Sequence, residues 1–137
     1  MATKSTLLRW TGEGLEFEAD GYGPGPSIML DSKSTSGPSP MDALLMGIAG
    51  CMAIDVLMIA QKSRVELGGL EVAAEGDRAE EDPKRYHTVR LVYRVSGASE
   101  ADAPKLQRAV DLSKEKYCSV LHTLRPDVEY DIRIERV

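Results

Sequence analysis

Apolar and polar side chains follow strand-like patterns in the first thirty residues of the chain. Residues 7–10 form a short apolar-rich run, and residues 15–19 alternate apolar side chains with glutamates. A period of two is typical of a strand with one buried face, and the Thr-Gly-Glu-Gly turn signal between the two runs predicts a hairpin. A glycine- and proline-rich loop follows at residues 20–26, and we expect a third strand at residues 28–30.

The central segment, residues 43–60, contains one charged side chain, Asp55, and predicts a long helix. Ser39 can cap its N-terminus, Pro40 suits the first helical position, and Asp42 stands where a capping-box acid belongs. The run is long enough to span a membrane, but a carboxylate in its middle would be costly in lipid. A helix that is apolar all round is then a buried central helix. Because a chain this short has few elements to surround it, we expect a second subunit to cover part of it.

Apolar and polar residues follow regular patterns again in the second half of the chain, and these patterns predict strands and helices in the order ββ-αα-β. The resulting fold class is α+β, mainly antiparallel, with the full order βββ-α-ββ-αα-β in a single domain over residues 1–137. We expect strands at residues 70–78, 89–95 and 128–134, an amphipathic helix at residues 102–116 and a shorter helical piece at residues 117–124.

Composition narrows the function classes. The chain has 137 residues and a formal net charge of −5, which argues against a nucleic-acid partner because such proteins need a positive surface. Residues 1–11 lack the apolar core of a signal peptide, so we expect a cytoplasmic protein without a membrane partner. The sequence has neither a phosphate loop nor a dinucleotide fingerprint, and we expect no cofactor.

Two cysteines are too few for a disulfide scaffold and need another explanation. Cys51 lies in the predicted central helix, where a free cysteine often packs as a small apolar side chain. Gly47 and Gly50 leave room for a close approach to it, and Asp55 lies one turn further on the same face. A buried carboxylate needs a partner, most simply an arginine.

Cys118 is expected near a helix N-terminus, which lowers a thiol pKa. The two cysteines are either a reactive thiol with its resolving partner or two unrelated packing residues.

A thiol in the middle of a helix gains little from the helix dipole, so reactivity would require a nearby cation. The candidates are Arg9 on the first strand and Arg90 or Arg94 on a later one, and the sequence does not choose among them.

Metal binding has little support in the spacing of possible ligands. Cys118 and His122 are four residues apart, and Cys51 and His87 would complete a set of four. This spacing is unlike that of known zinc sites, so we expect no metal.

Two segments resemble the OsmC/Ohr family, the osmotically inducible protein C and organic hydroperoxide resistance proteins. These are SPMDALLMGIAGCMAIDV at residues 39–56 and KYCSV at residues 116–120, the second followed by Leu124 and a C-terminal strand. The resemblance covers essentially the whole chain. It implies an intertwined α+β homodimer in which antiparallel sheets pack around two long, buried central helices.

The resemblance also implies a thiol-dependent peroxidase that reduces organic hydroperoxides in oxidative stress defence. Cys51 would be the peroxidatic cysteine, Cys118 would resolve its sulfenic acid as a disulfide, and a dithiol would reduce that disulfide again. Apolar pocket walls from Met41, Met46 and Met52 would suit an alkyl or lipid hydroperoxide.

The chain departs from the peroxidase branches of that family. Those branches pair a glutamate ten residues before the cysteine with an arginine from the N-terminal glycine-rich loop. Here Met41 holds the glutamate position, Asp42 follows it, and residues 21–26 contain no arginine. Asp42, Arg9 and Asp55 are therefore candidate supporting residues, although Arg9 is not a motif match and Asp42 is also explained as a helix cap.

The departures keep two other functions open. One is a non-catalytic dimer that binds a small apolar or electrophilic ligand or senses redox state, with Cys51 lining an apolar pocket. The other is a structural dimer whose buried cysteines are inert.

Overall fold

The computed structural model describes residues 2–137, and its element order confirms the predicted βββ-α-ββ-αα-β sequence, with two short helical turns added. The chain divides into two compact units, Met1–Leu44 and Leu45–Val137, and the prediction of a single domain stays a prediction. The elements are β1 (Leu7–Trp10), β2 (Glu16–Asp20), β3 (Ile28–Asp31), α1 (Pro40–Lys62), β4 (Gly69–Arg78), β5 (Tyr86–Ser96), η1 (Glu100–Asp102), α2 (Ala103–Leu112), η2 (Ser113–Tyr117), α3 (Ser119–Thr123) and β6 (Glu129–Arg136).

The first unit is a three-stranded antiparallel sheet in the order β1-β2-β3, which confirms the predicted hairpin and third strand. Asp31 ends β3 as a buried carboxylate and accepts hydrogen bonds from the backbone N–H groups of Lys33, Thr35 and Ser36. These donors favour the charged form and lower the pKa of Asp31. The carboxylate thereby fixes the turn that leads toward α1.

Helix α1 begins with the predicted capping box. The backbone N–H of Asp42 donates to Ser39 Oγ at 3.1 Å, and the backbone N–H of Ser39 donates to Asp42 Oδ2 at 3.2 Å. The Asp42 carboxylate also accepts from Ser34 Oγ, and the hydrogen bonds from Ser39 and Ser34 lower its pKa. The capping interpretation of Asp42 therefore accounts for its contacts.

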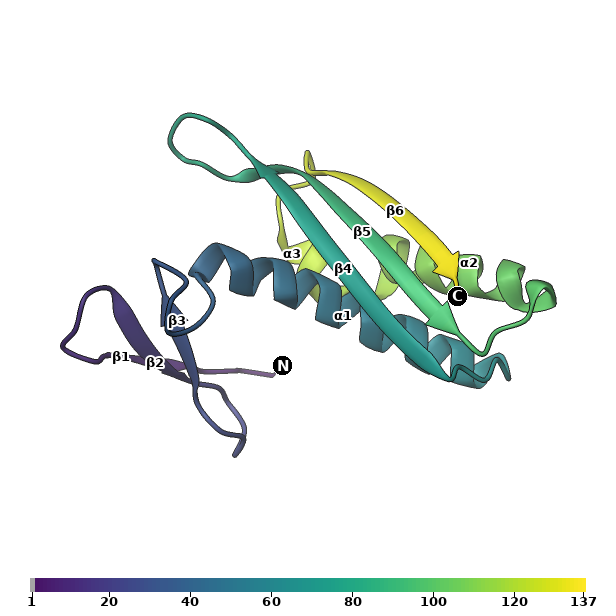
Figure 1. Cartoon of the computed structure of the whole chain (residues 1–137), viewed down its shortest axis with the longest axis horizontal. Helices are drawn as coiled ribbons and strands as arrows, with labels where there is room; N and C mark the ends of the chain where they lie inside the picture. The colour runs from purple at the N-terminus through teal and green to yellow at the C-terminus, as the bar shows by residue number, and fades with distance from the viewer. Residues whose placement is uncertain (1) are drawn as a thin grey trace. The chain divides into compact units, whose positions relative to one another are not determined.

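The second unit contains a mixed sheet, where the sequence had predicted antiparallel pairing. β4 pairs with β5 antiparallel, but β6 pairs with β5 in parallel. The chain leaves β5, runs through α2, η2 and α3, and returns in the same direction, as a crossover connection requires (Figure 1). Alternation alone fixes which face of β6 is buried and leaves the direction of β6 beside its neighbour undetermined.

The core of this unit lies between the sheet and the helices on one of its faces (Figure 1). On β5 every second residue from Val89 to Val95 is buried, and on α1 every fourth residue from Ile48 to Ala60 is buried. Ala60 of α1, Val95 of β5 and Leu106 of α2 pack together in one cluster. The buried residues that define the two faces are Ile48, Met52, Val56 and Ala60 on α1 and Val89, Leu91, Tyr93 and Val95 on β5.

One face of α1 remains open in the single chain. Met46, Ile54 and Met58 are 59%, 60% and 52% exposed. Residues 2–137 contain one long helix, so the second central helix of the expected pair would belong to a partner chain. By length and composition alone α1 is apolar enough to cross a membrane, but here its buried face covers a sheet, as the core helix of a globular fold does.

Candidate active site

Two elements bring the cysteines together although they lie far apart in the sequence. Cys51 is half-buried on α1, beside the row of residues that covers the sheet. Cys118 is fully buried and follows η2, a single π-helical turn in which the backbone N–H of Cys118 donates to the Ser113 carbonyl at 2.8 Å. Such one-turn π segments occur frequently at functional sites, because they insert a residue and redirect the chain.

Asp55 completes a cluster of three side chains. It lies four residues after Cys51 on α1, so the two side chains share a helix face. The Sγ atoms of Cys51 and Cys118 and a carboxylate oxygen of Asp55 all lie within 4.8 Å of one another. The sequence placed Cys51 and Asp55 together, whereas their meeting with Cys118 depends on the tertiary fold.

The hydrogen-bond partner of Asp55 is Ser113, where the sequence had favoured an arginine. Ser113 Oγ donates to Asp55 Oδ2 at 2.8 Å, and Ser113 itself is fully buried. In the described part of the chain no ion pair involves Asp55. Among the described residues, a neutral hydroxyl and not a basic side chain is therefore the partner of this carboxyl group.

Cys118 caps the short helix α3, as expected, but its pKa shifts opposite to the expected direction. Its sulfur accepts from the backbone N–H of Leu121 at 3.3 Å, which by itself lowers the thiol pKa. Burial outweighs this hydrogen bond and, together with Cys51 and Asp55, raises the pKa of Cys118 to about 11. At neutral pH Cys118 therefore holds its proton.

Two buried tyrosine hydroxyls lie near enough to the same cluster to interact electrostatically with it. The Tyr93 hydroxyl on β5 and the Tyr130 hydroxyl on β6 have no hydrogen-bond partner among residues 2–137. Burial raises the pKa of Tyr93 most, and the charges of Cys118, Asp55 and Cys51 raise it further. Burial and Cys118 likewise raise the pKa of Tyr130. A buried hydroxyl without a partner is costly, so these two donors are available to a bound oxygen atom.

Sequence reasoning missed both tyrosines and Ser113 as site residues. The alternation of β5 had placed Tyr93 on a buried face, and a buried tyrosine hydroxyl normally needs a partner. That signal marks Tyr93 as a candidate but does not say which groups it faces.

The arginines of β5 lie on the face opposite Tyr93, because successive strand residues point to opposite sides of a sheet. Arg90 forms ion pairs with Asp77 and Glu75, and Arg94 pairs with Glu135. Neither is placed to activate Cys51.

The remaining predicted site residues stay predictions. Arg9 belongs to the first unit, where Asp20 and Glu18 bind its guanidinium and raise its pKa. Met52 is fully buried, and Met46 is exposed. Met41 is half-buried in the first turn of α1.

One pocket reaches the thiol cluster through Asp55. It has a volume of about 450 Å³, and its other walls are mainly apolar. Its lining residues are Asp55, Met58, Ile59, Lys62, Leu112 and Tyr117.

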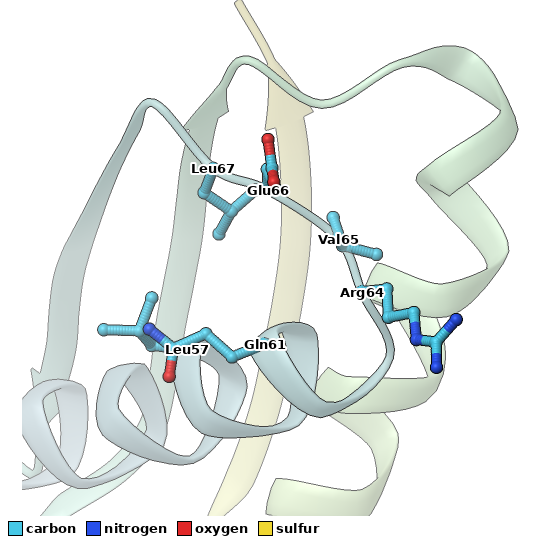
Figure 2. A pocket seen from close by; sticks show the side chains of 6 residues that line it. All are labelled: Leu57, Gln61, Arg64, Val65, Glu66 and Leu67. Carbon is cyan, nitrogen blue, oxygen red and sulfur yellow. The ribbon is translucent and has the colours of Figure 1, made fainter.

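A second pocket lies where α1 leads into β4, and Figure 2 shows that no thiol lines it. In this view Arg64 points away from Leu67, and Leu57 and Gln61 extend from the last turns of α1.

The three clustered groups are also the donors that a soft metal ion could use within residues 2–137. Binding by both sulfurs would require the Cys118 thiolate, and burial opposes its formation.

Comparison with known proteins decides the family. The sequence profile of OsmC-like proteins matches residues 32–133. The chain belongs to the OsmC-like family. It is 42% identical to the Escherichia coli K12 protein YhfA over 114 residues, which are 82% of this chain and 83% of YhfA.

Solved structures agree with this assignment. A hypothetical protein of Aquifex aeolicus VF5 superposes with a TM-score of 0.87 at 31% identity, covering 100% of this chain and 98% of the other. The organic hydroperoxide resistance protein OhrB of Bacillus subtilis superposes with a TM-score of 0.66 at 14% identity, covering 98% of both chains. The latter likeness shows a shared fold, within which this chain brings its two free cysteines close together.

Proposed function

We propose that this OsmC-like protein is a thiol-dependent peroxidase that reduces organic hydroperoxides through Cys51 and Cys118. The observation that carries the proposal is the meeting of the two free sulfurs, one half-buried and the other fully buried, within 4.8 Å. A peroxide can reach the first sulfur, and the second is held close enough to close a disulfide after a small movement.

In the first step the Cys51 thiolate attacks one peroxide oxygen. A sulfur–oxygen bond forms, the oxygen–oxygen bond breaks, and the alkoxide leaves and takes up a proton as an alcohol. Cys51 becomes a sulfenic acid.

In the second step Cys118 attacks the Cys51 sulfur. A disulfide forms, and the sulfenic oxygen leaves as water. A dithiol reductant then attacks the disulfide in two exchange steps, becomes a disulfide itself and returns both cysteines to thiols.

Tyr93 supplies the hydrogen bond that the missing loop arginine would otherwise give. Its buried hydroxyl has no hydrogen-bond partner among the described residues and interacts electrostatically with Cys118, Asp55 and Cys51. Donation to the peroxide or sulfenic oxygen would stabilise the charge that develops there.

The pocket beside Asp55 favours organic over inorganic peroxides. Met58, Ile59 and Leu112 give it apolar walls, against which an alkyl group gains free energy by leaving water. Hydrogen peroxide has no such group and gains nothing from these walls.

A homodimer in the cytoplasm is the proposed working form. Each chain exposes more large apolar side chains than single scattered surface positions account for. They include Met46, Ile54 and Met58 on α1 and Leu7 and Trp10 on β1. A second copy would bury such surface, as the resemblance implies.

A redox-sensing role is the second candidate. The raised pKa of Cys118 favours slow oxidation, and among the described residues each ion-paired arginine binds a carboxylate outside the cysteine cluster. A sensor would form the disulfide once and would show little turnover with a dithiol.

Steady-state reduction of cumene hydroperoxide by dithiothreitol tests the proposal. Wild-type protein should turn over, Cys51→Ser should not, and Cys118→Ser should accumulate a sulfenic acid that dimedone traps. Oxidation of wild-type thiols without turnover would favour the sensor, and activity that survives Cys51→Ser would refute the peroxidase.

A further inference from the structure

Asp55 lies between the pair of thiols and a pocket. An oxygen of its carboxylate lies within 4.8 Å of the sulfurs of Cys51 and Cys118, and Ser113 Oγ donates a hydrogen bond to Asp55 Oδ2 at 2.8 Å. The same residue lines the 450 Å³ pocket. No other acidic side chain joins the two sulfurs in the cluster found within residues 2–137.

The second step of the proposed reaction requires two proton transfers at this cluster. Cys118 is fully buried and protonated, so its sulfur must lose a proton as it attacks. The hydroxide that leaves Cys51 must gain one. Both events occur within reach of a single carboxylate, whereas the Tyr93 hydroxyl is a donor that also remains protonated.

We propose that Asp55 is the proton relay for disulfide formation, accepting the proton of Cys118 and delivering it to the oxygen that leaves Cys51. The inference rests on the proposed function and assigns a catalytic role to a residue that the arginine–glutamate chemistry of the peroxidase branches does not use. Ser113 is a positioning residue, because its hydroxyl orients the carboxylate and its carbonyl accepts the Cys118 N–H.

The balance of the step is complete. Cys51–S–OH and Cys118–SH give Cys51–S–S–Cys118 and water. The sulfur–sulfur bond forms, the sulfur–oxygen bond breaks, and the Cys118 proton ends on the departing oxygen. The hydroperoxide that made the sulfenic acid is the oxidant, and Asp55 returns to its ionised state.

Two effects of the Asp55 charge oppose each other, and this makes the relay testable. As a fixed negative charge, the carboxylate disfavours the Cys118 thiolate, so its removal alone would speed the attack. As a relay, it lowers the barrier, so its removal slows the attack. The sign of the change in rate separates the two roles.

The test uses mixed disulfides on Cys51 of the full-length reduced protein, so it does not depend on a peroxide. One protein sample receives substoichiometric 5,5′-dithiobis(2-nitrobenzoate), and another receives hydroxyethyl disulfide. Acid quenching and intact mass then follow the decay of each mixed disulfide to the Cys51–Cys118 disulfide. The mercaptoethanol group is a poor leaving group that needs a proton, whereas the nitrobenzoate thiolate leaves without one.

Asp55→Asn keeps the shape and still accepts from Ser113, and it should slow decay of the mercaptoethanol adduct by about 100-fold. The nitrobenzoate adduct should slow less. Ser113→Ala should show a smaller loss with the same dependence on the leaving group. Asp111→Asn, on the exposed face of α2, is the matched control and should leave both rates unchanged.

Faster or unchanged decay in Asp55→Asn would overturn the relay, as would equal slowing of both adducts, which would indicate a structural role. Absence of any hydroperoxide oxidation in wild-type protein would instead refute the proposed function, while the mixed-disulfide rates would still report on Asp55.

Discussion

At the scale of single residues, the site places the half-buried thiol of Cys51 beside the thiol of Cys118, which burial keeps protonated. The sequence indicates Cys51 and Asp55 as an i, i+4 pair on a helix and Cys118 as a second candidate thiol, and the structure places the three side chains within 4.8 Å of one another. The sequence does not indicate that a serine, and not an arginine, is the hydrogen-bond partner of Asp55. The position of Ser113 beside Asp55 depends on the path of the chain through η2.

The raised pKa of Cys118 predicts how its alkylation depends on pH. In Cys51→Ser, where Cys118 is the remaining thiol, burial is still the largest cause of the shift. The thiolate forms only as pH rises past the ordinary thiol range, so the iodoacetamide rate should climb with a midpoint above 9 and toward 11. The same variant unfolded in urea serves as the reference, and a native midpoint at or below that of the unfolded chain would contradict the assignment.

Tyr93→Phe should separate stability from chemistry. Removing a buried hydroxyl without a partner should leave the free energy of unfolding unchanged or raise it by about 1 kcal/mol. Loss of the donor should slow oxidation of Cys51 by cumene hydroperoxide by about 10-fold or more. Urea unfolding and stopped-flow thiol loss measure the two effects, and a destabilised variant with normal oxidation would refute the role given to this hydroxyl.

At the scale of elements, local patterns in the sequence predicted most of the fold. The capping box fixed the start of α1, and alternation found β5 with its buried face. The predicted helix at residues 102–116 instead ends at Leu112 and continues as the π turn η2. Periodicity has no signal for one inserted residue, nor for the parallel placement of β6, because both are set by tertiary contacts.

A close contact between β4 and β5 gives a prediction about the second unit. A Cβ atom at Gly76 would lie 2.5 Å from a ring carbon of buried Tyr86. Gly76→Ala should therefore lower the free energy of unfolding by about 1–3 kcal/mol, because the ring must move within a packed core. Gly68→Ala is the matched control, since its added Cβ would make an ordinary contact at 3.6 Å. Equal stability of the two variants in urea would contradict this packing.

At the scale of the whole molecule, one chain leaves a long apolar helix half covered. We predicted a helix that is buried on all sides, but in the single chain only one face of α1 is buried, the face with Met52 and Val56. Composition could suggest a missing partner but could not identify the residues that it would cover.

Ile54→Lys tests the proposed homodimer. Ile54 is 60% exposed in the single chain, so a charge there should cost little if the chain works alone. At a dimer interface an unpaired buried charge would shift the protein toward monomer in sedimentation experiments. Gln107→Lys, at an exposed position on α2, should leave the assembly unchanged. A monomeric wild-type protein would contradict the dimer.

The most direct test of the central claim is the fate of the two thiols after one equivalent of cumene hydroperoxide without oxygen. The account predicts loss of both free thiols within seconds and a peptide map containing the Cys51–Cys118 disulfide. Native protein that keeps both thiols reduced for many minutes, while the unfolded chain reacts, would contradict it.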